Sequence, residues 1–289
     1  MIVVRIYGGL GNQMFQYAAA RALAAKYNVP LKLDLRWMRR YRHRDFLLDR
    51  FPISIQKPIW TDRLKFTWFP FQRHPFFLYS KIIRRLSPLF YMETLISYDL
   101  GFWNLGPNCF LFGYFQSEKY FRDYGHLIRK DFSYNPDLSL YDKGVIEAVR
   151  MPGATAVQFR RGDYITNPAA NRTIGICPME YYERAVAYIK SQKKEIQLIV
   201  FSDEIDWCKT NVNFGELIFV ERKGGSPLDD MFLATQCEHI ILANSTFSWW
   251  CAWLNQNPNK IVIAPKTWFK DEELNKQAYD LIPDSWVRL

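Results

Sequence analysis

The sequence predicts an α/β fold of two doubly wound halves with a cleft between them. Three observations favour it. A β-α-β pattern opens the chain, strands rich in Ile and Val alternate with helices after residue 153, and a less regular stretch separates the two regions. Alternation of this kind is typical of parallel sheets covered by helices on both faces. At 289 residues the chain is long enough for two such domains.

The first half opens with an expected strand, a glycine turn and a helix. Residues 2–8, "IVVRIYG", form the strand, and residues 9–27 contain six alanines, which have high helix propensity. The apolar segment 29–35, "VPLKLDL", is the next expected strand. A β-α-β unit implies parallel pairing with a right-handed crossover.

The pattern becomes irregular between residues 36 and 150, and this region contains the expected domain boundary. Prolines interrupt an aromatic stretch at 66–80. A helix is predicted over 117–131, beginning at a serine, which is a preferred capping residue. The polar run 133–144 is the predicted linker, so we divide the chain into domains 1–145 and 146–289.

Regular alternation returns in the second half. These elements predict a parallel, doubly wound sheet. Ligands of such sheets bind beyond the carboxyl ends of the strands, so polar segments at those ends are the candidate site. Strands are expected at 154–159, 196–202, 216–221, 239–244 and 260–265, and helices at 178–192, 227–237 and 245–256.

The composition favours a soluble, cytoplasmic protein with an anionic partner. The chain has 38 basic and 29 acidic residues, a net charge of +9 and a pI near 9.2, with basic residues concentrated at 36–44 and 81–85. No apolar run approaches the roughly 18 residues of a membrane span, and no cleavable signal pattern is present. The five cysteines and four histidines show no metal-ligand spacing.

The first polar segment is "GGLGNQ" at 8–13, between the first strand and helix. Glycines at such a turn let the backbone approach a ligand and expose helix amides to an anion. It is not a dinucleotide fingerprint, because Met14 replaces the last glycine of G-x-G-x-x-G. Asn12 and Gln13, polar residues at the turn itself, favour a functional role over a plain turn.

The second segment, "AVQFRRGDY" at 156–164, places two arginines at the end of an apolar strand. Side chains alternate along a strand, so Gln158 and Arg160 are expected to share a face, with Arg160 at the carboxyl end. A planar guanidinium binds phosphate oxygens through two parallel hydrogen bonds. The competing interpretation is an Arg161–Asp163 ion pair that holds the loop. We expect Asp163 to orient one arginine while the other stays free.

The third segment is "ANSTFSWW" at 243–250, where a strand is expected to meet a helix. Asn244 or Ser245 is a natural capping residue. The hydroxyls of Ser245, Thr246 and Ser248 are expected beside free helix amides, which suits a phosphate. The tryptophans that follow are expected to pack in the core.

Two acidic segments complete the set, "FSDE" at 201–204 and "LDD" at 228–230. They either accept hydrogen bonds from a base such as guanine or stabilise the starts of helices. No D-x-D motif occurs in the chain, so a diphosphate is expected to be held by arginines and helix amides, with no metal ion.

Three of these segments together, "GGLGNQMFQYA", "RRGDY" and "NSTFSWW", resemble glycosyltransferase family 11, the alpha-1,2-fucosyltransferases. The resemblance covers essentially the whole chain. It implies a GT-B-like fold of two Rossmann-like halves, with an acceptor-side domain at 1–145 and a GDP-fucose-binding domain at 146–289. It also implies inverting, metal-independent transfer of L-fucose from GDP-beta-L-fucose to the 2-hydroxyl of a galactose-containing glycan, without a cofactor.

The resemblance also implies roles for individual residues. Arg160, Asn12 and Asp163 are the expected catalytic residues, with Arg160 stabilising the departing GDP. Gln158 and Tyr164 are expected to contact the acceptor or to support the site from behind. Gln158 is a departure, because the family pattern H-x-R-R-x-D has histidine there. The expected donor-binding residues are Gly9, Gly11, Gln13, Arg161, Ser202, Asp203, Asp230, Asn244, Ser245, Thr246 and Phe247.

The expected partners are GDP-fucose and a galactose-terminated oligosaccharide or lipid-linked glycan, with no nucleic acid. The chain resembles the bacterial cytoplasmic members, and the basic segment 36–44 favours peripheral contact with the inner membrane surface. Three alternatives stay open. They are a nucleic-acid binder, a nucleotide-sugar transferase of another linkage, and a catalytically weak glycan- or GDP-binding relative, which Gln158 favours.

Overall fold

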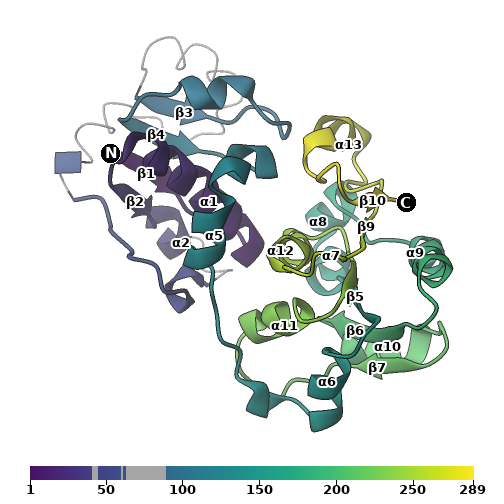
Figure 1. Cartoon of the computed structure of the whole chain (residues 1–289). Coiled ribbons are helices and arrows are strands. Elements are labelled where there is room, and N and C mark those ends of the chain that lie inside the picture. The colour runs from purple at the N-terminus through teal and green to yellow at the C-terminus, as the bar shows by residue number, and fades with distance from the viewer. Residues whose placement is uncertain (41–44, 60, 63–88) are drawn as a thin grey trace. The chain divides into compact units, whose positions relative to one another are not determined.

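The computed structural model describes residues 1–40, 45–59, 61–62 and 89–289, and the chain divides into two compact units (Figure 1). The first unit comprises Met1–Ser133 and Tyr279–Leu281, and the second comprises Tyr134–Ala278 and Ile282–Leu289. The chain thus leaves the first unit at the start of the predicted linker. The basic segment 81–85, the aromatic stretch 66–80 and residues 41–44 of the other basic segment lie outside the described residues.

The first unit contains a parallel sheet with the strand order β2-β1-β4-β3. Ile2 lies opposite both Leu31 and Cys109, so β1 and β4 are central and their carboxyl ends are adjacent. The strands are β1 (Ile2–Arg5), β2 (Leu31–Asp34), β3 (Phe90–Met92) and β4 (Cys109–Phe112). The α-helices described here are α1 (Leu10–Tyr27), α2 (Arg36–Arg40) and α5 (Gly125–Asp131).

The predicted β-α-β opening forms as expected, because the alanines of α1 allow close packing on the sheet. Ala18, Ala19 and Ala20 are fully buried. The helix ends at Asn28, whose φ of 50° is the left-handed conformation typical of a helix end.

The helix predicted over 117–131 is interrupted. Ser117 caps a 3-10 turn at Glu118–Tyr120, and α5 begins only at Gly125. Phe121, with φ −148° and ψ 2°, breaks the helical backbone between them. Strands β3 and β4 were not predicted, because segments of three or four residues give little periodic signal.

The second unit contains a parallel sheet with the strand order β10-β9-β8-β5-β6-β7. Counted along this unit, the order is 3-2-1-4-5-6, that of doubly wound nucleotide-binding sheets. The predicted α/β fold of two halves with parallel sheets is therefore confirmed. The strands are β5 (Ala154–Phe159), β6 (Gln197–Ser202), β7 (Leu217–Phe219), β8 (His239–Ile241), β9 (Val262–Ala264) and β10 (Val287–Arg288).

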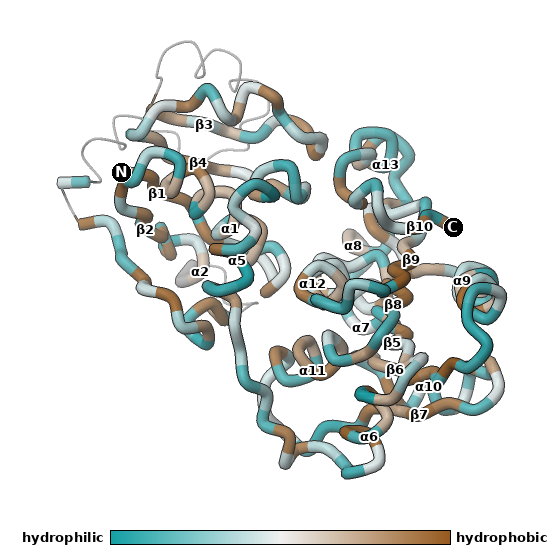
Figure 2. The backbone as a smooth tube through the Cα atoms, viewed as in Figure 1, coloured by the Kyte–Doolittle hydropathy of each residue, from teal (hydrophilic) through white to brown (hydrophobic). Residues whose placement is uncertain are grey.

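Helices cover both faces of this second sheet (Figure 1). On one face, Val157 and Phe159 of β5 pack with Tyr182 and Ile189 of α9 and with α10. The other face carries α11 and α12, and the strands between are hydrophobic (Figure 2). The helices are α6 (Lys143–Ala148), α7 (Gly162–Thr166), α8 (Pro168–Thr173), α9 (Met179–Gln192), α10 (Ile205–Asn211), α11 (Pro227–Ala234), α12 (Thr246–Leu254) and α13 (Glu272–Gln277).

The direction of the connections reverses between β5 and β8. β5 leads through α9 towards β6 on one side, and β8 leads through α12 towards β9 on the other. The loops that follow β5 and β8 therefore diverge on opposite faces of the sheet. Divergence of this kind opens a crevice at the carboxyl edge, where ligands of doubly wound folds bind.

Gly153 fixes the start of β5, and its replacement by alanine should destabilise the second unit. Its φ is +75°, and an added Cβ would lie 2.3 Å from the carbonyl oxygen of Glu195. Overpacking against backbone and a left-handed alanine together should cost about 2 kcal/mol or more of unfolding free energy. Urea denaturation of Gly153→Ala measures the loss. In the control, Gly144→Ala, the added Cβ meets nothing within 4 Å. This helical position should gain up to about 1 kcal/mol. Equal stability of the two variants would contradict the argument.

Candidate functional site

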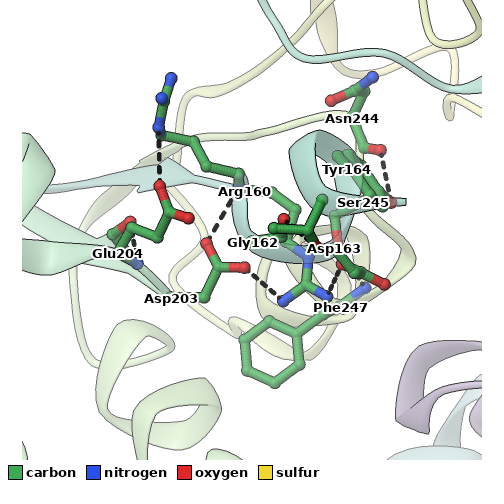
Figure 3. Close-up of polar contacts among 12 residues, drawn as sticks. Arg160, Gly162, Asp163, Tyr164, Asp203, Glu204, Asn244, Ser245 and Phe247 are labelled. Atoms are coloured by element: carbon green, nitrogen blue, oxygen red, sulfur yellow. Dashed lines mark hydrogen bonds and ion pairs between the residues drawn. The ribbon is translucent and has the colours of Figure 1, made fainter. Parts of the chain in front are cut away.

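Three polar segments meet at the carboxyl edge of the second sheet. Arg160–Asp163 follows β5, Ser202–Glu204 ends and follows β6, and Asn244–Phe247 follows β8 (Figure 3). They surround the β5–β8 reversal, where doubly wound sheets bind ligands. All three segments were predicted at strand ends, and the fold of the second unit brings them together.

Arg160 is held between two carboxylates. Its Nη1 lies 2.9 Å from Oδ2 of Asp203, and its Nη2 pairs with Oδ1 of Asp163. The guanidinium carbon lies 5.5 Å from the ring centroid of Tyr164. The Arg160 side chain remains 28% exposed. The arginine is thus oriented by its partners before any ligand is bound.

The competing interpretation, an Arg161–Asp163 ion pair, is wrong, whereas the expectation that Asp163 orients one arginine is confirmed. Asp163 pairs with Arg160, three residues before it in sequence. Arg161 instead bonds Glu204 through Nε at 3.1 Å, and its guanidinium carbon lies 3.4 Å from the ring centroid of Trp207. The expectation that one arginine stays free is therefore also wrong. Glu204 and Trp207 are site residues that the sequence analysis missed, although Glu204 belongs to its "FSDE" segment.

Asp203, in the loop after β6, contacts both arginines of the β5 loop, and Gly162 makes room for it. The Oδ1 atom of Asp203 accepts a 3.0 Å hydrogen bond from the Arg161 amide, while its other oxygen pairs with Arg160. A Cβ on Gly162 would lie 2.6 Å from Oδ2 of Asp203. The Ser202 hydroxyl accepts a hydrogen bond from the Glu204 amide and stabilises the same turn. Asp203 and Ser202 thus organise the arginines.

The start of α12 is capped by Ser245, as predicted. Its hydroxyl accepts a 3.2 Å hydrogen bond from the Phe247 amide. Thr246 and Phe247 are partly exposed, whereas Ser248 is buried and cannot offer its hydroxyl to a phosphate at the surface. The tryptophans Trp249, Trp250 and Trp253 are buried, which confirms their predicted core position.

Asn244 supports the site from beneath, contrary to the expected donor contact. It is 3% exposed, and its Nδ2 lies 3.1–3.2 Å from the carbonyl oxygens of Ile174, Gly175 and Trp268. Tyr164 has a related role, since its phenol donates a 3.4 Å hydrogen bond to the Asn244 carbonyl. Burial raises the pKa of Tyr164 to about 12, so the phenol stays a neutral donor.

Asp230 belongs to a separate cluster. Its carboxylate accepts a 2.7 Å hydrogen bond from the Tyr141 phenol and lies 3.3 Å from Nη1 of Arg222. Burial raises its pKa. Its neighbour Asp229 forms a capping box with Ser226 at the start of α11. The helix-start interpretation therefore holds for Asp229, while a ribose or guanine contact for Asp230 stays a prediction.

In the first unit, the glycine turn leads from β1 into α1. Gly8 has a φ of +82° and lies against Asn12, so it is the position that requires glycine, while the predicted Gly9 caps α1 and Gly11 is buried within it. The Oδ1 atom of Asn12 accepts a 2.8 Å hydrogen bond from Gln116. Asn12 remains partly exposed at the carboxyl edge of the sheet.

Gln13 is a structural residue of this turn. It is fully buried and donates to the carbonyl oxygens of Gly8 and Asp45, at 3.0 and 2.8 Å. Its Oε1 accepts a 3.1 Å hydrogen bond from the Leu47 amide. Both amide hydrogens are used within the protein, so the expected donor contact of this side chain does not fit its position.

Comparison with known proteins decides the family. The model of the family described as "Glycosyl transferase family 11" matches residues 1–289. The chain belongs to glycosyltransferase family 11. The predicted resemblance is confirmed over the whole length, and the protein is a glycosyltransferase.

Two relatives of this glycosyltransferase from Escherichia coli match nearly end to end. An alpha-1,2-colitosyltransferase is 34% identical over 100% of this chain and 99% of its own length. The O-antigen biosynthesis glycosyltransferase WbnK is 35% identical, covering 98% of each chain. A galactoside alpha-(1,2)-fucosyltransferase 2 from Oryctolagus cuniculus is 24% identical over 88% of this chain and 67% of its own length.

Among solved structures, the NodZ alpha-1,6-fucosyltransferase soaked with GDP-fucose is 18% identical with a TM-score of 0.47, covering 88% of this chain and 92% of that chain. The fold assignment rests on the strand order of the second unit. Within the described ranges, no helix has the length and apolarity to span a membrane. The same residues contain no group of three or more His, Cys, Asp or Glu side chains able to hold a metal ion.

Gln158, where the resemblance implies a histidine, is buried near the end of β5, and the partners of Arg160 are Asp163 and Asp203 instead. Gln158 is 3% exposed, and its side chain lies beside the thiol of Cys251 in α12. Its Oε1 atom is buried without a partner among the described residues. The strand ends at Phe159, so the alternation that predicted a shared face does not extend to Arg160. A direct contact with an acceptor sugar does not fit this burial.

Because of this burial, Gln158→Glu should make stability fall with pH. A buried carboxyl group without a cation has a raised pKa, so between about pH 4.3 and that pKa the folded state binds more protons than the unfolded state. Unfolding free energy relative to the wild type should therefore decrease as pH rises from 4 to 8, measured by urea denaturation. Gln158→Met removes the unpartnered oxygen and should stay within about 1 kcal/mol of wild type at all these pH values. A pH-independent difference for the glutamate variant would show that the position is solvated.

Proposed function

We propose that this glycosyltransferase moves L-fucose from GDP-beta-L-fucose to the 2-hydroxyl of a galactose-containing glycan, inverting the anomeric configuration without a metal ion. The observation that carries the proposal is the position of Arg160 at the reversal of the second sheet. Its guanidinium lies at the edge where doubly wound folds bind nucleotides. Relatives with alpha-1,2-transferase names match over most of the chain and support the linkage.

In this reaction the acceptor oxygen attacks the anomeric carbon while the bond from that carbon to the phosphate oxygen breaks. GDP leaves with the bonding electron pair, and the acceptor hydroxyl loses its proton. Negative charge therefore develops on the phosphate, and a preorganised cation stabilises it most. We assign this role to Arg160, with Arg161 and the first amides of α12 as further donors and with Asn12 near the reacting sugar.

The two carboxylates around Arg160 make the site selective for a strong anion. Asp163 and Asp203 orient the guanidinium and neutralise it while no donor is bound. A diphosphate must displace at least one of these carboxylates from Arg160 in order to bind. A weakly charged ligand cannot compete with a carboxylate for the guanidinium, so it binds weakly. Asp163, whose side chain is 32% exposed against 25% for Asp203, is our candidate for displacement.

A second donor, GDP-colitose, is favoured by one observation. The E. coli alpha-1,2-colitosyltransferase matches the entire chain at 34% identity. Colitose is L-fucose without the 3-hydroxyl group, so the two donors differ at a single position. A site built to hydrogen-bond that hydroxyl rejects the deoxy sugar by about 10⁴-fold, whereas an apolar site discriminates far less. The ratio of kcat/KM for the two donors decides between them.

The acceptor is proposed to be a galactose-terminated oligosaccharide or a lipid-linked glycan. The name of WbnK, an O-antigen biosynthesis glycosyltransferase, supports a surface glycan. Action in the cytoplasm, with peripheral contact at the inner membrane surface, is part of the same proposal. A nucleotide-sugar transferase of another linkage, and a weak binder of GDP or glycan, are the outcomes that the two tests below distinguish.

The donor assignment predicts selective stabilisation by GDP. A ligand that binds only the folded state raises the unfolding free energy by about 2.7 kcal/mol at a hundredfold excess over Kd. We expect GDP to raise the melting temperature, and UDP, CMP and NAD to leave it unchanged, in a thermal-shift series at equal ionic strength. Stabilisation by UDP or CMP without GDP would replace the donor. GDP binding without transfer of either sugar would favour the weak binder.

Arg160 should be required for turnover but not for folding. Loss of a preorganised charge-stabilising contact lowers kcat by on the order of 100- to 1000-fold. Arg160→Ala should fall by at least that factor. Arg160→Lys should also fail, because an ammonium cannot replace the planar guanidinium. Transfer is measured with EDTA present, with Arg150→Lys, an exposed position of the same unit, as the control. Near-normal kcat in Arg160→Lys would contradict the role.

A further inference from the structure

A partly exposed aromatic pair lies at the carboxyl edge of the first sheet. Tyr7 follows β1 and Tyr114 follows the adjacent β4, and their ring centroids are 4.9 Å apart. Tyr114 is 42% exposed, although its ring packs against that of Tyr7. Trp37 and Phe112 flank Tyr7 at 5.7 and 5.4 Å. The loops after the two central strands thus present aromatic rings beside the glycine turn.

The flanking rings have a structural role that the tyrosine pair does not share. The buried guanidinium of Arg5, paired with Asp34, lies 5.0 Å from the Trp37 ring and 5.3 Å from the Phe112 ring. These cation–π contacts account for Trp37 and Phe112. Tyr114 is not among the rings around Arg5, and burying it would require no change in that cluster.

The turn that carries Tyr114 is firmly held. The Glu93 carboxylate accepts hydrogen bonds from the amides of Tyr114 and Phe115, at 2.6 and 3.0 Å. A side chain on Gly113 would collide with Glu93, since an added Cβ would lie 2.5 Å from its Cβ. Phe115 has a φ of +56°, a strained value for a residue other than glycine. A strained, pinned turn that leaves a tyrosine ring in solvent indicates a ligand-binding role.

Polar groups that suit sugar hydroxyls lie next to this ring. Gln116, two residues after Tyr114, donates a hydrogen bond to Asn12 at 2.8 Å, and both side chains are partly exposed. Burial raises the pKa of both Tyr7 and Tyr114, so their phenols remain neutral hydroxyl groups. An apolar surface with a few neutral donors and acceptors is the usual composition of a sugar or small-molecule site.

We propose that Tyr7 and Tyr114 form the subsite for the galactose ring of the acceptor, with the Asn12–Gln116 amide pair bonding its hydroxyl groups. Galactose has one face made of the C3, C4 and C5 hydrogens, which packs on an aromatic ring as other apolar surfaces do. Glu93 is a positioning residue that holds the Tyr114 turn. The assignment rests on the proposed function for the choice of galactose.

Saturation-transfer NMR on the full chain tests this subsite without turnover. The probes are methyl β-D-galactoside, lactose and N-acetyllactosamine. Saturation should be strongest at the galactose H3, H4 and H5 protons in the wild type. Tyr114→Ala should weaken binding roughly tenfold, the scale of one aromatic stacking contact, and Tyr114→Phe should keep the pattern. Tyr279→Ala, at a tyrosine 60% exposed in the same unit, is the matched control and should behave as wild type.

The melting temperature and its increase with GDP show that each variant is folded. Both should be unchanged in Tyr114→Ala, while the acceptor KM for transfer rises about tenfold. No saturation of any galactoside in the wild type, or equal binding by wild type and Tyr114→Ala, would overturn the subsite. If GDP fails to stabilise the wild type, the donor proposal is contradicted and the subsite is not. Galactoside binding that is present in the wild type and lost in Tyr114→Ala would still support the subsite in that case.

Discussion

The candidate site depends on one electrostatic constraint: a guanidinium held between two carboxylates where the strand order reverses. Arg160 is oriented by Asp163 from its own loop and by Asp203 from the neighbouring strand. The same Asp203 bonds the backbone amide of Arg161, so a single carboxylate fixes both arginines. A cation that is already oriented loses little freedom when a phosphate arrives, which is how preorganised charge favours both binding and catalysis.

The fold supplies this constraint through its most hydrophobic part. β5 is buried along its whole length and pairs with β6 on one side and β8 on the other. Arg160 and Asp203 follow the two paired strands, so their register determines how far apart the cation and the carboxylate lie. Asn244 and Tyr164 then join the β5 and β8 loops from beneath. The apolar sheet thus sets the geometry, and the polar groups only complete it.

The first unit positions its polar residues by a different means. Hydrogen bonds from single buried or pinned side chains hold its turns: Gln13 joins the glycine turn to residues 45–47, and Glu93 holds the turn after β4. Such contacts keep Asn12 and Tyr114 at the same edge of the sheet.

The sequence alone determined the fold class, the strand β5, the three polar segments and the family, because hydrophobic periodicity and short motifs are local signals. It missed β3, β4 and β10, which have two to four residues and little periodicity. Only the tertiary structure decided the partners. Arg160 pairs with Asp203 from another strand, Arg161 with Glu204 43 residues away, and Gln158 is buried against Cys251. These contacts depend on the strand order and on the register between strands, and the local sequence around each residue specifies neither.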